Sequence, residues 1–302
     1  PVWYAASRRV ERSLKLRRLP LLAMGAAFTF VIMMFNIPIP GGSGGHMVGA
    51  TVAAIVLGPW AGVVALSLAL TLQAFLFADG GVTTLAANCF NMAFVMSFAG
   101  YYTYRALSYG DAGGVRRFLS AAAAAYIAVI LAALSVAIEL GIQPHIAHGI
   151  DGRPLYAPYP LSVTIPAMTI PHLLFFAPVE ALGTALVVSY AHKTGTDILY
   201  RPDARLRPLW AVLVALVVLT PLGLIFSGTP WGEWGMEELL GLTGYLPQGM
   251  ERLGGLWRGV LPGYNLPGSG GIWAVVFYVV SAALGSSAVV SLIYLWGRLW
   301  PR

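Results

Sequence analysis

The five histidines of this 302-residue sequence are its side chains best suited to bind a metal ion. Neutral imidazole is a good ligand for nickel, cobalt, copper and zinc. His46 ends a glycine-rich run that begins at Asn36 and contains four glycines around Ser43. Such a backbone can bring an imidazole to an ion, or it can simply turn the chain between two helices. The pattern by itself leaves both interpretations open.

Two further histidines, His145 and His148, are three residues apart in a segment that Pro144 and Gly149 interrupt. On a helix this spacing would place both imidazoles on one face, where they could chelate a metal. With Glu139 they would suggest a metal-dependent membrane hydrolase. The proline and the glycine favour an exposed loop instead.

His172 and Glu180 lie eight residues apart, which is about two helical turns, so they can share one face of a helix. Glu180 falls deep within an apolar run, where a charge costs about 2.5–3.5 kcal/mol. Its carboxyl group is therefore expected to face the interior. A polar relay with His172 and a hydrogen bond that packs two helices are both open interpretations. His192, at the end of the same run, is expected to cap the helix.

Three amide side chains also lie within apolar runs. Asn88 and Asn91 are three residues apart, just after the sequence Asp79-Gly80-Gly81, and Gln73 precedes it. Buried amides require hydrogen-bond partners. They are expected either to hold a loop that folds into the bundle or to join helices.

Ala23 and Ala27 give the first apolar run a face of small residues. Small residues four apart let another membrane helix approach closely. This face is a candidate surface for a partner helix, with packing inside the chain as the alternative.

The composition of the chain is that of an integral membrane protein with most of its mass in the bilayer. Hydrophobic residues make up 58% of it, charged residues 10%, and the mean hydropathy is +0.75. Soluble domains carry about 25% charged residues. In such a chain the net charge of +6 reports orientation, not nucleic-acid binding. The single cysteine, Cys89, excludes an intrachain disulfide and is expected to be a buried apolar residue.

Runs of about 20 apolar residues predict an all-α integral membrane protein, a polytopic helical bundle with about eight spans. The predicted spans are 20–37, 47–58, 60–78, 82–104, 117–141, 161–191, 208–227 and 272–297. Residues 1–19 begin apolar and turn basic, as the tail of a further helix would.

Basic residues fall mostly on one side of these spans. Of the 18 lysines and arginines, all but Arg153, Arg252 and Arg258 share a side. The positive-inside rule makes that side cytoplasmic. Four segments are then external: the His46 loop, the Asp79-Gly80-Gly81 turn, residues 142–160 and residues 228–271.

Several signatures of membrane enzymes and pumps do not occur. The sequence has no Walker A motif, so it would not hydrolyse ATP alone, and it has neither HExxH nor GxSxG.

Several motifs in order carry a resemblance to a known family. They are Asn36 to His46, Leu57-Gly58-Pro59-Trp60-Ala61, Gln73 to Gly81, Ala87 to Met92, and His172 with Glu180 and Thr184. Over residues 1–192 the chain resembles the cobalt/nickel substrate-capture subunits of energy-coupling factor transporters. Residues 208–302, with Trp231 to Gly235 and Tyr245 to Glu251, resemble the two-span accessory domain often fused to them, and 193–207 would be a cytoplasmic linker.

The resemblance implies import of Ni(II) or Co(II) as substrate, with no organic cofactor, across a prokaryotic cell membrane. His46 would ligate the ion together with nitrogens of a Met-His segment that would precede Pro1; without that segment we expect no tight binding. The residues that would position this closing segment are Asn88, Asn91, His172, Gln73 and Ser43. The partners would be a transmembrane coupling subunit, contacted through Ala23 and Ala27, and two cytoplasmic ATPases.

Overall fold

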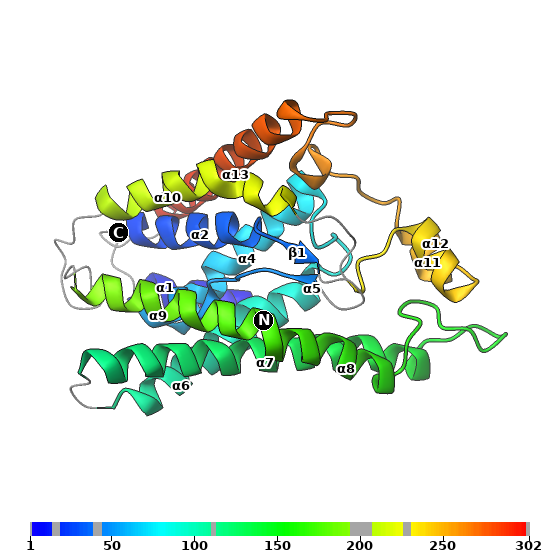
Figure 1. The fold of residues 1–302 in the computed structure, drawn as a ribbon, viewed down its shortest axis with the longest axis horizontal. Helices are drawn as coiled ribbons and strands as arrows, with labels where there is room; N and C mark the ends of the chain where they lie inside the picture. The colour runs from blue at the N-terminus through cyan, green and yellow to red at the C-terminus, as the bar shows by residue number, and fades with distance from the viewer. Residues whose placement is uncertain are drawn as a thin grey trace.

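The computed structural model describes residues 2–13, 19–38, 44–109, 113–193, 207–225 and 231–299, and most of them lie in helices (Figure 1). The first half contains α1 (Val2–Ser13), α2 (Leu19–Met33), α3 (Ala50–Leu57), α4 (Pro59–Phe77), α5 (Leu85–Asn88), the π-helical η2 (Cys89–Val95) and α6 (Met96–Leu107). Next come α7 (Gly114–Ile146), α8 (Leu161–Pro171), the π-helical η3 (His172–Phe176) and α9 (Ala177–Lys193). The C-terminal part contains α10 (Arg207–Leu219), the 3-10 helix η4 (Thr220–Ile225), α11 (Met236–Thr243), α12 (Gln248–Leu253), the 3-10 turn η5 (Pro262–Tyr264) and α13 (Ile272–Arg298).

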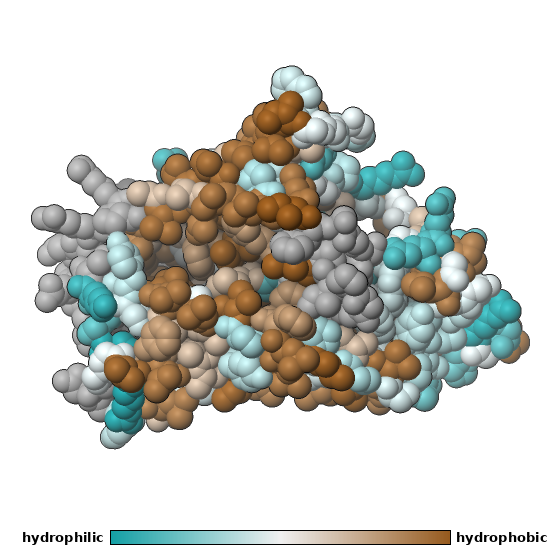
Figure 2. All heavy atoms as spheres, viewed as in Figure 1, coloured by the Kyte–Doolittle hydropathy of each residue, from teal (hydrophilic) through white to brown (hydrophobic). Residues whose placement is uncertain are grey.

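Four helical segments are long and apolar enough to cross a bilayer by themselves: Pro59–Phe77, Gly114–Ile146, Leu161–Lys193 and Ile272–Arg298. Two shorter apolar segments are Leu19–Met33 and Leu209–Ile225. Figure 2 shows hydrophobic side chains over the middle of the molecule, while hydrophilic ones gather mainly at the end that carries α11 and α12. The prediction of a helical, multi-pass membrane protein is confirmed.

Two of the predicted helices contain a π-helical segment. The range 82–104 is built from α5, η2 and α6, and the range 161–191 from α8, η3 and α9. A π-helical segment adds a residue to a turn without changing the apolar character of the run, so composition does not reveal it. Such segments are frequent at functional sites, and η2 and η3 carry Asn91 and His172.

The Gly58-Pro59 pair reverses the chain between α3 and α4. Gly58 has φ +92°, a conformation open to glycine, and Pro59 opens α4. A Cβ on Gly62 would lie 3.4 Å from the Cα of Ala54, so residues on either side of the turn are in contact. The short α3 therefore packs back on α4.

The main core lies where α13 and α4 pack on α2. The ring of Phe30 is 5.8 Å from that of Phe77, and it occupies the space that a side chain at Gly285 of α13 would need. Ala23 and Ala27 belong to this core and are fully buried. The prediction that they form a surface for a partner helix is therefore wrong: their small size serves packing inside the chain.

Candidate functional site

His46 directly follows a two-residue antiparallel ladder that closes the glycine-rich loop. β1 (Ile37–Pro38) pairs with β2 (Gly44–Gly45), Ile37 opposite Gly45. Ser43 lies outside the described residues. The partly buried His46 has Nδ1 3.1 Å from the main-chain oxygen of Met47. When Nδ1 carries the proton and donates it there, Nε2 keeps the lone pair that a metal requires.

Residues 45–49 lie along one stripe of the η3–α9 helix. The ring of Phe176 fills the space beside Gly45, where a Cβ would come within 2.8 Å. The end of the Met47 side chain fills the space beside Gly183. Phe176, Glu180 and Gly183 are spaced four and three residues apart, so they line one face.

Glu180 is the polar centre of this stripe. One carboxylate oxygen accepts the amide hydrogen of Val48 at 2.8 Å, and the other accepts that of Gly49 at 2.9 Å. Gly49 is the N-cap of α3 and has no side chain to cap it. Glu180 supplies the capping carboxylate from another helix and places its charge at the N-terminus of α3. The prediction that Glu180 faces the interior is confirmed, since it is 1% exposed.

His172 begins η3 and continues the same stripe outward. Its ring packs against Phe176 at 5.1 Å between centroids, and its Nδ1 lies 2.6 Å from the main-chain oxygen of Met168. It is close enough to His46 for one imidazole charge to act on the other. The predicted shared face of His172 and Glu180 is present. The described hydrogen bonds of Glu180 nevertheless run to backbone amides, not to His172.

Asp79 lies in a turn that Asn88 holds, and its charge acts on the His46 ring. Asn88 donates from Nδ2 to the carbonyl oxygen of Gly80 at 2.8 Å. Gly80 and Gly81 have φ of +73° and +69°, which favours glycine at both positions. Asn88 therefore orders the Asp79 turn, as expected of a loop-holding amide.

The other two amides have different partners. Asn91 in η2 donates to Glu139 of α7 at 2.7 Å, so it joins two helices. Gln73 in α4 donates to the hydroxyl of Tyr264 at 2.9 Å, near the far end of the chain. The Asn91 contact holds no loop in the part of the chain that the structure describes, whereas the Gln73 contact joins α4 to the C-terminal segment.

The environment of His46 favours the neutral imidazole. Burial lowers the pKa of His46 below its ordinary value of 6.5, and the carboxylate of Asp79 and the main-chain bond to Met47 oppose this shift only in part. A neutral ring at pH 7 is the form that binds a metal.

The described residues contain no group of three or more histidine, cysteine, aspartate or glutamate side chains that could enclose a metal. His145 and His148 are exposed, whereas Glu139 is paired with Asn91. The hydrolase site considered from the sequence is therefore not assembled. His46 in turn would need ligands from outside the described residues to hold an ion.

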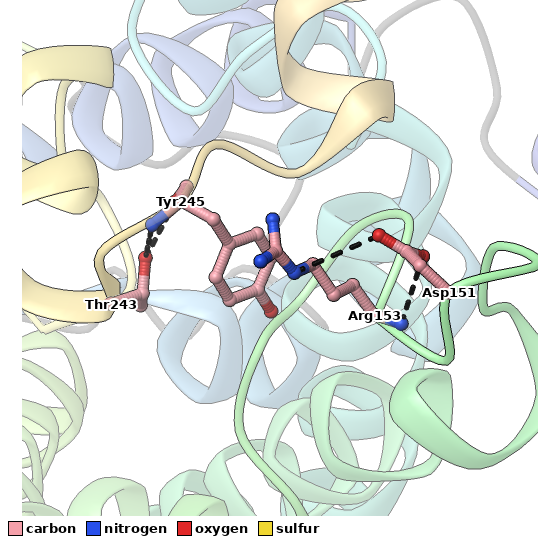
Figure 3. Close-up of polar contacts among 4 residues, drawn as sticks. All are labelled: Asp151, Arg153, Thr243 and Tyr245. Carbon is pink, nitrogen blue, oxygen red and sulfur yellow. Dashed lines mark hydrogen bonds and ion pairs between the residues drawn. The ribbon is translucent and has the colours of Figure 1, made fainter.

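Part of the C-terminal segment packs on the connection between α7 and α8. The guanidinium of Arg153 lies 5.4 Å from the ring centre of Tyr245, and its Nε lies 3.6 Å from a carboxylate oxygen of Asp151 (Figure 3). Gly249 donates its amide hydrogen to Leu155 at 2.7 Å. These contacts fix α11 and α12 beyond the end of α7 and α8 (Figure 1).

Sequence reasoning missed Phe176, Gly183 and Tyr264. The first two stand four residues before and three after Glu180, and that helical spacing was the available signal. No local signal marks Tyr264, because its partners are about 190 residues away.

Comparisons with known proteins find similar sequences that cover most of this chain. The family model described as "CbiM: Cobalt uptake substrate-specific transmembrane region" matches residues 1–198. The "Fused nickel transport protein NikMN" of Rhodobacter capsulatus is 43% identical, over 96% of this chain and 89% of its own length. The "Probable fused nickel transport protein LarMN" of Lactiplantibacillus plantarum is 44% identical, over 83% of this chain and 78% of its own length.

A solved structure of the same class is also similar. The "Crystal Structure of an transition metal transporter" superposes with a TM-score of 0.61 at 47% identity, and the match covers 68% of this chain and 90% of that one. The family resemblance inferred from the ordered motifs is confirmed. This chain belongs to the CbiM family of substrate-specific transmembrane regions.

Proposed function

We propose that this protein is the substrate-binding membrane subunit of an energy-coupling factor importer for Ni(II) or Co(II). The observation that carries the proposal is the fixed placement of the His46 segment on the Phe176–Glu180–Gly183 stripe, in a chain of this family. The nickel transport relatives that match most of the chain support nickel, and the family description supports cobalt.

The ion would bind through Nε2 of His46 on the external face. The remaining nitrogens would come, as the resemblance implies, from a Met-His segment. An all-nitrogen set of this kind suits both ions, since selectivity would rest on geometry and availability. Asn88 and His172 would support the segment that closes over the ion.

The proposed topology has about eight spans, with His46 external and the lysine- and arginine-rich connections cytoplasmic. The asymmetry of basic residues supports this orientation in a prokaryotic cell membrane. Residues 1–192 would be the capture domain, 193–207 the linker and 208–302 the accessory domain. The accessory external segment would help to load the site.

Two cytoplasmic ATPases and a transmembrane coupling subunit would supply the energy. The sequence lacks a Walker A motif, which supports this division of labour. The coupling subunit would contact a surface other than Ala23 and Ala27, since both are buried.

Uptake of radioactive nickel tests the proposal. Cells that express the complete gene with its coupling subunit and ATPases should accumulate nickel, and the His46→Ala variant should lose nearly all accumulation. A His192→Ala variant, changed at the opposite end of α9, should retain it. Equal uptake by the His46→Ala variant and the wild type would contradict the assignment.

A further inference from the structure

The C-terminal end of α4 has main-chain carbonyl groups that no helical turn can satisfy. Ala78 leaves the helix with φ +54°, and Asp79 donates its amide hydrogen back to Gln73 at 3.1 Å. A left-handed residue at this position is a common way to end a helix. The oxygens of Phe75 and Leu76 remain available for other donors.

Residues 257–261 supply those donors. Trp257 donates from Nε1 to the oxygen of Phe75 at 2.8 Å. The amide groups of Val260 and Leu261 both donate to the oxygen of Leu76, at 2.7 and 2.8 Å. A segment about 180 residues away thus caps α4.

Gly259 makes this approach possible. Its φ is +72°, and a Cβ there would lie 2.8 Å from the amide nitrogen of Ala78. Any other residue would push the capping segment away from α4. The close contact is therefore built into the sequence at this position.

Tyr264 adds further contacts between this segment and α4, and we call the contacts among Gln73, Asp79 and Tyr264 the junction. Its hydroxyl donates to a carboxylate oxygen of Asp79 and accepts from Nε2 of Gln73 at 2.9 Å. Its buried ring stacks on Phe77 at 4.7 Å. Ser281 of α13 donates to its main-chain oxygen at 2.9 Å. Burial, with the charge of Asp79, raises the pKa of Tyr264 well above its ordinary value, so the hydroxyl keeps the proton that it donates.

We propose that Tyr264 is a positioning residue through which the C-terminal segment fixes the carboxylate of Asp79 in the turn at the end of α4. This inference rests on the proposed function, because it assigns the fixed carboxylate a role in capturing the cation. The charge of Asp79 acts on the His46 ring. A carboxylate that a neutral hydroxyl holds in place is positioned to attract an approaching divalent ion.

A metal-free double-mutant cycle tests the junction in the full-length protein. Tyr264→Phe and Asp79→Asn should each lower the Tm by about 2–4 °C, and the double variant should lose clearly less than the sum. Tyr278→Phe is the matched control: Tyr278 donates to the oxygen of Met34, not to Asp79. Its effect should add to that of Asp79→Asn. Additive losses for Tyr264→Phe and Asp79→Asn would overturn the junction.

Nickel titration of the same proteins tests the consequence. Tyr264→Phe should weaken Ni(II) binding about 3- to 10-fold, whereas the control Tyr278→Phe should leave it unchanged. In a protein that already carries Asp79→Asn, adding Tyr264→Phe should weaken binding no further. Unchanged affinity of Tyr264→Phe would overturn the role in capture. A wild type that binds no nickel would contradict the proposed function itself, while the metal-free cycle would still decide whether the junction exists.

Discussion

The carboxylate of Glu180 shows how a buried charge can be useful in a membrane protein. Non-helical backbone within a helical bundle must find hydrogen-bond partners. Val48 and Gly49 find theirs in one side chain, and the carboxylate is satisfied by the same two bonds. Glu180 thus fixes the backbone two and three residues after His46.

Removing this carboxylate should destabilise the fold. Glu180→Ala leaves two buried amide groups without an acceptor, so we expect a loss of about 2–4 kcal/mol in the free energy of unfolding. Glu180→Gln keeps one oxygen and should lose less. Unfolding in mixed micelles measures both, with the exposed Glu238→Ala as control. A Glu180→Ala protein as stable as the wild type would rule out the capping role.

The titration of His46 should reflect its burial. Its pKa is lowered below 6.5, so the ring is neutral at pH 7, and protons compete with nickel only as the pH falls through the lower value. NMR titration of the metal-free protein, with His46→Ala to assign the signal, measures this pKa. A value at or above 6.5 would show that the ring is not desolvated.

Sequence reasoning at the residue scale identified His46, Glu180 and His172 because their types and spacing are local properties. It did not predict that Glu180 caps α3 or that Gln73 contacts Tyr264. Those contacts join residues 131 to 191 positions apart, and no local pattern encodes them.

At the scale of elements, α9 acts as a support for the His46 segment. Gly45 meets Phe176 at the end of η3, the side chain of Met47 meets Gly183, and the amides of Val48 and Gly49 both meet Glu180. The contact between Gly45 and Phe176 restricts the position of β2, because an aromatic ring has fewer rotamers than a methionine side chain and cannot move aside as easily.

Enlarging Gly45 should therefore displace His46. Gly45→Ala places a methyl group against the ring of Phe176, and such overpacking costs about 1–3 kcal/mol. If this cost is subtracted from the free energy of nickel binding, the affinity should be about 5- to 150-fold weaker. Adding Phe176→Leu makes room and should restore part of it. Calorimetry of the single and double variants checks this, and Gly241→Ala on α11, where nothing lies within 4 Å, is the control. No recovery in the double variant would contradict the steric explanation.

The elements themselves were largely predictable. Long apolar runs placed the helices, and Gly58-Pro59 placed the break between α3 and α4. The π-helical segments and the packing of α13 on α2 were not predictable, because they depend on which faces meet. For the same reason the sequence predicted that Ala23 and Ala27 contact a partner helix, whereas the structure places both in the core.

On the scale of the whole molecule, the C-terminal segment contacts two parts of the rest of the chain. It packs on the α7–α8 connection through Tyr245 and Gly249, and on the end of α4 through Trp257 and Tyr264. The Asp79 turn is fixed by the second of these contacts. The segment is therefore an integral part of the face that the proposed orientation makes external.

Cysteine labelling tests the proposed orientation. In a protein with the buried Cys89 replaced by alanine, Ile150→Cys should react with a membrane-impermeant maleimide added to intact cells, because Ile150 is exposed and predicted to be external. Tyr109→Cys, which is also exposed but predicted to be cytoplasmic, should react only after lysis. The reverse pattern would invert the topology and place His46 inside.

Calorimetric titration of the full-length protein with Ni(II) tests the central claim most directly. The titration uses the protein with every residue that its gene encodes before Pro1, alongside His46→Ala and the control His192→Ala. We predict that the wild type and the control bind one nickel ion tightly, and that His46→Ala loses this binding. An unchanged affinity in the His46→Ala protein would contradict the account.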